Sequence, residues 1–192
     1  MPSPLAPSLP ADAAMRRVSA IARRMQWLTL CGIAMTLAGM IALWFWLSDA
    51  ALEQHLRRFL EIRAAEYRVL VSMPYRLAGF VITAGAASVL VGGLMEARKL
   101  FAAFAHGMVF TLETALRLRR VALMVTAFSA VVPLTKTLLG LALVSGDGPG
   151  PYMLVIVNFG DFALGLLGGL LLAIAWAMVE AARIARENEG FV

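Results

Sequence analysis

The sequence contains few of the residues that form disulfides, bind metals or carry charge. One cysteine, Cys31, and two histidines occur among 192 residues, so an intramolecular disulfide is excluded and packing alone must hold the fold. Charged residues make up only 15% of the chain, against 61% hydrophobic residues and a mean hydropathy of +0.81. Soluble domains of this size are far less apolar, so the composition indicates an integral membrane protein in a lipid bilayer.

The motifs of common enzyme classes are also missing. The chain has no HExxH, GxSxG or P-loop pattern, and the glycines at 146–150 lie in a proline-flanked turn rather than a phosphate-binding loop. His55 and His106 fall on opposite sides of the topology derived below, so they cannot share a metal ion or a haem. We therefore expect no enzymatic activity, no cofactor and no metal site.

Four apolar runs dominate the chain. Crossing a hydrocarbon core of about 30 Å takes about 20 residues, and we predict spans at residues 26–47, 77–95, 121–144 and 152–179. Each run carries small and polar residues on one helical face, which lets membrane helices pack closely. In the first and last runs, these small and polar residues include Thr29, Gly32, Thr36, Gly39, Gly165, Gly168 and Gly169. The sequence thus predicts an all-α polytopic membrane protein, an antiparallel bundle of four transmembrane helices over residues 25–180.

The flanking and connecting segments differ in character. Residues 1–24 are rich in proline and then in arginine, which predicts a disordered basic tail, and residues 181–192 are expected to form a C-terminal tail. Residues 48–76 carry apolar side chains at roughly helical spacing among nearly balanced charges. This pattern predicts an amphipathic helix between the first two spans, lying on the membrane surface or capping the bundle.

Tryptophan and basic residues indicate the orientation of the spans. Trp27 is expected at one membrane interface, and Trp44 with Trp46 at the other. The N-terminal tail, the second connection and the C-terminus together carry eleven Lys and Arg, whereas the first and third connections carry five. This bias predicts that both termini lie in the cytoplasm. The net charge of +5 is then explained by orientation, and direct nucleic-acid binding is not expected.

One lysine lies inside the third run. A lysine near the middle of a span costs roughly 3 kcal/mol on insertion scales, so Lys136 must face something other than lipid. If both helices start at the predicted residues, Asp161 lies at the same depth, and we predict a Lys136–Asp161 pair. Asn158, one turn above Asp161, is a further hydrogen-bonding group, and Thr137 shares the polar face of Lys136. Pro133 frees a backbone carbonyl nearby, which can kink the helix or provide a hinge.

The second connection carries a local pattern that predicts a capped turn. Gly107 is expected to end one helix after Phe104, Thr111 to cap the next helix, and Glu113 to lie in the first turn of that helix, where the helix dipole favours an acid. Phe104 and Phe110 are expected to hold the loop against the helices. The motif is explained by a well-formed turn or by a binding site, and the turn is the simpler explanation.

The same residues carry a family resemblance. Phe104, Gly107, Phe110 and Thr111 form an F-x-x-G-x-x-F-T pattern, and a helix rich in Leu and Arg, with Arg119, follows it. In this pattern and in its closing residues 182–192, the chain resembles a bacterial four-span membrane family known only as a domain of unknown function (domain-of-unknown-function family 2975). Members are often encoded beside small helix-turn-helix regulators. The resemblance therefore implies a membrane partner of such a regulator.

Three functions stay open at this stage. The first is a membrane-embedded regulator that binds a cytoplasmic helix-turn-helix protein through its second connection and C-terminus. The second is a small transporter or channel that uses the Lys136–Asp161 pair, although such a pair can also simply fix helix register. The third is a structural subunit of a membrane complex, which includes a homo-oligomer.

Overall fold

The computed structural model describes residues 9–62, 67–108, 111–145 and 158–189. Along the chain these residues form α1 (Leu9–Ile41), the π-helical turn η1 (Ala42–Trp46), α2 (Asp49–Phe59), β1 (Arg68–Val69), α3 (Met73–Ala105), α4 (Leu112–Leu143), β2 (Val144–Ser145) and α5 (Phe159–Glu189). The described part of the chain is therefore almost entirely helical, as the sequence predicts.

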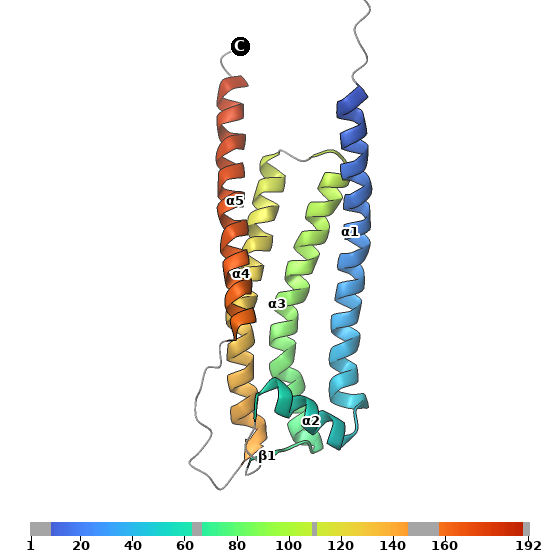
Figure 1. Ribbon diagram of the computed structural model, residues 1–192, viewed down its shortest axis with the longest axis vertical. Helices are drawn as coiled ribbons and strands as arrows, with labels where there is room; N and C mark the ends of the chain where they lie inside the picture. Colours follow the sequence, from blue (N-terminus) through green and yellow to red (C-terminus); the bar gives the residue numbers. More distant parts are fainter. Residues whose placement is uncertain (1–8, 63–66, 109–110, 146–157, 190–192) are drawn as a thin grey trace, which may run out of the picture.

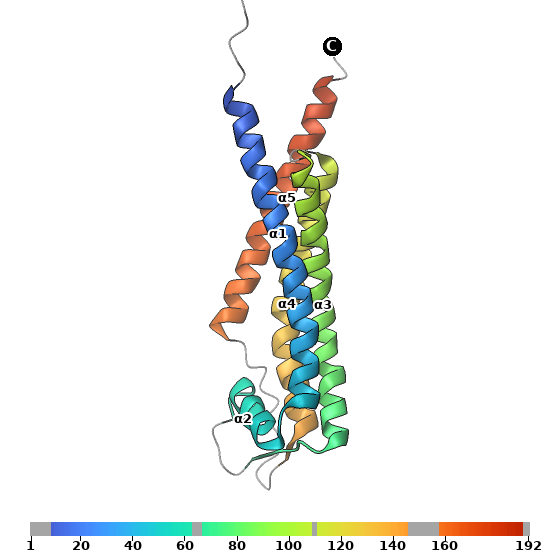
Figure 2. The ribbon, with the colours of Figure 1, turned by 90° about the vertical axis from the view of Figure 1, so that its right-hand side faces the viewer.

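The four long helices lie in a row. α1 packs on α3, α3 on α4, and α4 on α5. Figures 1 and 2 place α1 and α5 at the two edges of this row, with consecutive long helices running in opposite directions. The start of α1, the α3–α4 connection and the end of α5 share one end of the molecule, the terminal end; α2 and the strand pair occupy the other, the α2 end (Figure 1). Because lipid is as apolar as leucine, a row in a bilayer needs no closed core.

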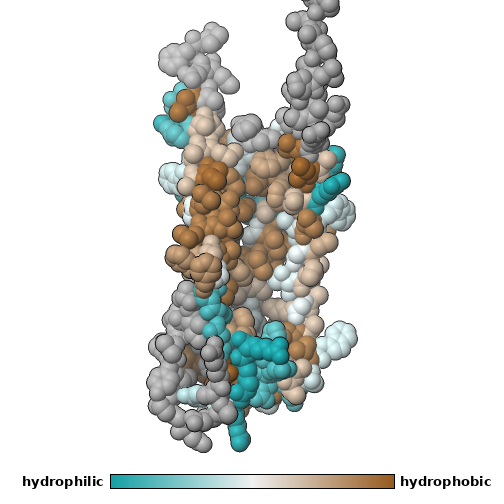
Figure 3. Space-filling model, viewed as in Figure 1, coloured by the Kyte–Doolittle hydropathy of each residue, from teal (hydrophilic) through white to brown (hydrophobic). Residues whose placement is uncertain are grey.

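The long helices have the length and composition of membrane spans. The four candidate segments are Val18–Trp46, Met73–Ala105, Leu112–Leu143 and Phe159–Ile184. At 1.5 Å per residue, the 32 residues of α4 measure about 48 Å, more than a hydrocarbon core of about 30 Å. Apolar side chains cover the middle of the face in Figure 3, whereas hydrophilic ones gather over α2. These features indicate a multi-pass membrane protein.

The helices run past the predicted spans. α1 begins at Leu9, inside the segment expected to be a disordered tail. Residues 11–24 contain neither proline nor glycine and are rich in Ala and Arg, which favour helix, so the first helix includes them. The predicted connection at 96–120 is likewise helical on both sides of a short turn, since α3 reaches Ala105 and α4 starts at Leu112.

A cluster of buried apolar side chains lies at the α2 end. It consists of Trp44, Leu52, Leu56, Leu60, Val69, Leu139 and Leu143. α2 contributes Leu52 and Leu56 to it and exposes His55 and Arg58. The predicted helix at 48–76 is thus confined to Asp49–Phe59, and the chain then forms β1, which pairs antiparallel with β2. Two-residue strands show no readable alternation, so sequence patterning could not predict this pair.

Trp44 corrects the interface prediction. Its side chain is fully buried, and its indole Nε1 donates a hydrogen bond of 2.9 Å to Thr83 Oγ1. A Cβ atom at Gly79 would lie 2.0 Å from the Trp44 ring, so the close approach of α3 requires glycine there. Trp46, two residues further on, is 86% exposed and remains a candidate for the interface.

Arg76 joins the segments at the α2 end. Its buried guanidinium donates to the carbonyl oxygens of Trp44 (2.7 Å), Leu47 (3.0 Å) and Val71 (3.0 Å), and to Asp49 Oδ1 (2.6 Å). One side chain therefore holds η1, the start of α2 and the start of α3 together. It also satisfies carbonyls that the helical segment ending at Trp46 leaves without internal partners.

The α3–α4 turn follows its predicted chemistry. Gly107 adopts φ +80°, a left-handed conformation that ends α3 without strain. Thr111 caps α4: its Oγ1 accepts the backbone N–H of Thr114 at 3.2 Å, and the Thr114 hydroxyl accepts the N–H of Thr111 in return. Glu113 lies in the first turn of α4. The helix break and the cap are both confirmed.

Candidate functional site

The site begins where α4 and α5 approach each other. A Cβ at Gly168 would lie 2.4 Å from Thr126 Oγ1 and 2.8 Å from the Thr126 backbone nitrogen, and one at Gly165 would lie 3.2 Å from Ser129 Oγ. Gly169, one of the small residues expected to let the helices pack closely, has nothing within 4 Å of its would-be Cβ. The glycines in close contact with α4 are therefore Gly165 and Gly168, three residues apart on α5. Their contact places the start of α5 beside the second half of α4.

Pro133 and two threonines shape α4 at this point. Pro133 is buried in the helix and has no backbone N–H, so it removes one hydrogen bond of the helix. Thr137 Oγ1 donates to the Pro133 carbonyl oxygen at 3.0 Å, and Thr135 Oγ1 donates to the Val131 carbonyl oxygen at 2.8 Å. Both hydroxyls are engaged within α4. Thr137 thus supports the helix beside Lys136 instead of contacting the aspartate.

The structure brings Lys136 and Asp161 together. Lys136 Nζ lies 3.7 Å from Asp161 Oδ2, and the two side chains are only 7% and 13% exposed. A hydrogen bond between an ammonium and a carboxylate is shorter, at about 2.7–2.9 Å. Among the residues that the structure describes, no carbonyl or hydroxyl oxygen accepts a hydrogen bond from this ammonium. The pair is therefore an ion pair held apart by about an ångström more than direct contact needs.

Asp161 occupies the first turn of α5. Its Oδ2 accepts the backbone N–H of Asn158 at 3.1 Å, while the Asn158 carbonyl accepts from Phe162 N at 3.1 Å. This is the acidic half of a capping box, and the partial positive charge of the helix start also favours the carboxylate. Asn158 thus contributes its backbone rather than its side chain. The helix depth used to predict the pair was wrong, because α5 begins at Phe159 and not at Tyr152; residues 152–157 lie outside the described part.

Phe59 completes the environment of the lysine. Lys136 Nζ lies 5.5 Å from the centroid of the Phe59 ring, a distance at which the ring face attracts a cation. Phe59 is the last residue of α2 and is therefore distant in sequence from both members of the pair. From the sequence, Phe59 could be placed only on the apolar face of the predicted helix at 48–76. That pattern does not indicate Lys136 as its partner.

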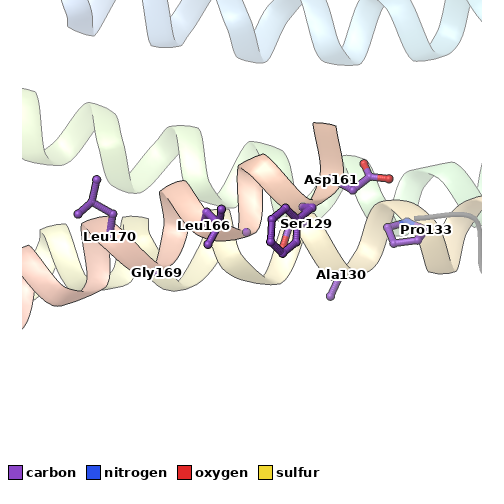
Figure 4. Close-up of a pocket in the computed structure, with 9 residues that line it drawn as sticks. Ser129, Ala130, Pro133, Asp161, Leu166, Gly169 and Leu170 are labelled. Atoms are coloured by element: carbon purple, nitrogen blue, oxygen red, sulfur yellow. The ribbon is translucent and has the colours of Figure 1, made fainter. Parts of the chain in front are cut away.

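Two hollows flank α4 at this level. The α4–α5 groove has a volume of about 510 Å³, and Figure 4 shows its lining from Pro133 and Asp161 at one end to Gly169 and Leu170 at the other. The α1–α3–α4 cavity has about 270 Å³, and its lining includes Phe59, Thr83 and Thr135. Lys136 thus contacts one lining residue of each hollow, Asp161 and Phe59. Apart from these few polar groups, both linings are largely apolar.

The residues of the family pattern lie elsewhere. Phe104, Gly107 and Thr111 surround the α3–α4 turn at the terminal end, and Phe110 lies outside the described residues. The 25 residues from Thr111 to Lys136 correspond to about 37 Å of helix. Arg119 stacks its guanidinium over Trp176, 5.1 Å from the ring centroid. The two predicted sites therefore lie at opposite ends of α4.

Comparison with protein-family models, with curated protein sequences and with solved structures finds no match to the chain. The family resemblance therefore stays a prediction, and the site must be interpreted from its own geometry. Within the described residues, no group of three or more His, Cys, Asp or Glu side chains is placed to hold a metal ion.

Proposed function

We propose that the chain is a small transporter of a bacterial inner membrane and that the Lys136–Asp161 pair couples it to protons. One observation carries this proposal. The acid, inside one candidate membrane helix, lines the α4–α5 groove, and the cation, inside another, contacts Phe59 of the α1–α3–α4 cavity. The two groups are 3.7 Å apart rather than in direct contact. Ionisable residues within spans commonly mark solute or proton pathways.

The geometry around α4 supports this role over a purely structural pair. A register-fixing pair gains most from short, direct hydrogen bonds, because those offset the cost of burying two charges. Here the 3.7 Å separation lacks that direct hydrogen bond, so the pair gains less from its geometry than a register-fixing pair would. Pro133 weakens the hydrogen bonding of α4 one turn before Lys136, which is where a helix that opens one hollow and closes the other would bend.

The test is proton uptake into liposomes. The purified chain is reconstituted with a pH-sensitive dye inside, and a potassium gradient with valinomycin supplies the driving force. We expect uptake above that of protein-free liposomes, loss of uptake in Lys136→Ala, and unchanged uptake in the control Arg183→Gln, an exposed charge on α5. Equal rates in Lys136→Ala and the unsubstituted chain would refute the role of the pair.

A double variant separates a folding defect from lost transport. Removing one member leaves a buried charge without its partner, whereas removing both in Lys136→Ala with Asp161→Ala leaves none. The double variant should therefore fold and yet show no proton uptake. A fully active double variant would show that the pair only fixes the packing of α4 against α5.

A second candidate function rests on a different observation. At the terminal end, α1 and α5 extend beyond the α3–α4 turn (Figure 1), and exposed basic side chains surround that turn. These residues are Arg23, Arg24, Arg98, Lys99, Arg119 and Arg120. With this end in the cytoplasm, the projecting helices and the basic surface suit a soluble partner such as a helix-turn-helix regulator.

Co-purification from the native membrane in mild detergent, followed by mass spectrometry, tests this second candidate. A stoichiometric DNA-binding protein that is lost with Arg98→Ala and Arg119→Ala would support it. The control is Arg58→Ala, an exposed arginine on α2 at the other end. Recovery of the same partner from all variants would place its docking surface elsewhere, and recovery of lipid alone would count against a regulator.

A further inference from the structure

A charged pocket lies between α3 and α4 at the terminal end, away from the Lys136–Asp161 pair. It has a volume of about 290 Å³ and is lined by Lys99, Glu113, Leu116, Arg117 and Arg120. Glu96 adjoins it, because its carboxylate contacts both Lys99 and Arg120. Three cations against two carboxylates give this cluster one net positive charge.

The ion pairs within the pocket leave Arg120 as its available cation. Lys99 Nζ lies 2.6 Å from Glu96 Oε1, and Arg117 Nη2 lies 2.6 Å from Glu113 Oε1. Arg120 lies 3.9 Å from Glu96 Oε2, too far for a hydrogen bond, and its side chain is 66% exposed. Within the described part of the chain, that Glu96 oxygen is buried and accepts no hydrogen bond. Arg120 is therefore the lining cation that makes no hydrogen bond to a carboxylate of the cluster.

Two tryptophans lie at about the same height along the helices as the pocket. Arg119, adjacent to Arg120, lies over the ring of Trp176, which is 56% exposed. On the other edge, α1 and α3 touch where a Cβ at Gly32 would meet Leu94 at 3.4 Å. The two helices run in opposite directions. Trp27 on α1 and Lys99 on α3 each lie five residues, about 7.5 Å along the helix, from this contact. Trp27 and Lys99 therefore lie at the same level.

Exposed tryptophans gather at the boundary between lipid tails and headgroups. Trp27 is 69% exposed, so both edge helices present an indole near the level of the pocket. Basic pockets between membrane helices at this depth bind the phosphates of lipid headgroups. We propose that the α3–α4 pocket binds the phosphate of an anionic phospholipid, with Arg120 as the main donor and Lys99 and Arg117 as supporting cations.

Lipid counting on the full chain tests the proposal. The delipidated protein in detergent is titrated with phosphatidylglycerol or phosphatidylcholine, and bound lipids are counted by native mass spectrometry. We expect the anionic lipid to bind more tightly, and Arg120→Gln to lower its affinity about fivefold, the effect of one basic side chain near an anionic headgroup. Phosphatidylcholine carries the same phosphate, but its choline cation offsets the negative charge, so it should bind less tightly and lose less affinity on this substitution. Arg183→Gln removes an equal charge outside the pocket and should have no effect.

A variant that is expected to raise the lipid affinity distinguishes a binding effect from a folding defect. Glu113→Gln releases Arg117 from its ion pair and raises the net charge of the pocket, so it should tighten binding of phosphatidylglycerol. Glu113 is itself exposed, and the substitution should leave the fold intact. Equal affinities for the two lipids, or an Arg120→Gln variant that binds like the unsubstituted chain, would overturn the proposal.

A free phosphate presents the same chemistry as a headgroup. The titration is therefore repeated in excess inorganic phosphate, with chloride at matched ionic strength as the control. Retention of phosphatidylglycerol in phosphate buffer supports the lipid. Its displacement by phosphate but not by chloride would identify a soluble phosphate as the ligand and overturn the assignment to lipid.

Discussion

The two ends of the molecule use arginine in opposite ways. At the α2 end, Arg76 is 8% exposed and makes four hydrogen bonds to three segments of the chain. At the terminal end, Arg119 and Arg120 are exposed, and their contacts are a tryptophan ring and a distant carboxylate. A buried, fully engaged arginine stabilises a fold, whereas exposed ion pairs contribute little. The α2 end is thus joined by a buried side chain, whereas the arginines of the terminal end stay exposed.

Removing the buried arginine should give the largest effect. Arg76→Ala leaves the carbonyl oxygens of Trp44, Leu47 and Val71 without their donor. Each buried acceptor left unsatisfied costs about 1–3 kcal/mol, so we expect a loss of at least about 3 kcal/mol in the free energy of unfolding. Thermal unfolding in detergent, followed by tryptophan fluorescence, measures it. The control is Arg58→Ala on the exposed face of α2, which should change little. Equal effects of the two variants would remove the distinction between the ends.

The packing of Trp44 should give the second largest effect. In Gly79→Ala the new methyl group would lie 2.0 Å from the indole, and overpacking of this kind costs about 1–3 kcal/mol. Gly85→Ala provides a matched control on the same helix, since nothing lies within 4 Å of its would-be Cβ. Alanine favours helix over glycine by about 1 kcal/mol, so the control should be neutral or stabilised. A stable Gly79→Ala variant would mean that Trp44 can move out of the core.

The sequence predicted the local features and one long-range pair. Gly107 and Thr111 were assigned correctly because helix ends obey local rules of backbone and side-chain chemistry. Lys136 and Asp161 could be matched because few charges occur within the apolar runs and each needs a partner. The matching succeeded although the start of α5 was misplaced.

The contacts made by α2 could not be predicted. Whether Trp44 faces lipid or the core depends on where α2 lies, and Arg76 fixes that position through three groups distant in sequence. The contact between Phe59 and Lys136 follows from the same placement. Periodicity reports which face of a helix is apolar, but it does not report what that face meets.

The cap of α4 should give the smallest effect and sharpens the contrast between the ends. Thr111→Ala removes the acceptor of the Thr114 N–H, and loss of such a cap costs about 1 kcal/mol. Thr111→Ser keeps the hydroxyl and should restore most of the stability in the same unfolding assay. Hydrogen exchange should increase in the first turn of α4 but not around Arg76, because the cap acts locally. A loss as large as that of Arg76→Ala, with exchange rising at both ends, would mean that the terminal end is as essential to the fold as the α2 end.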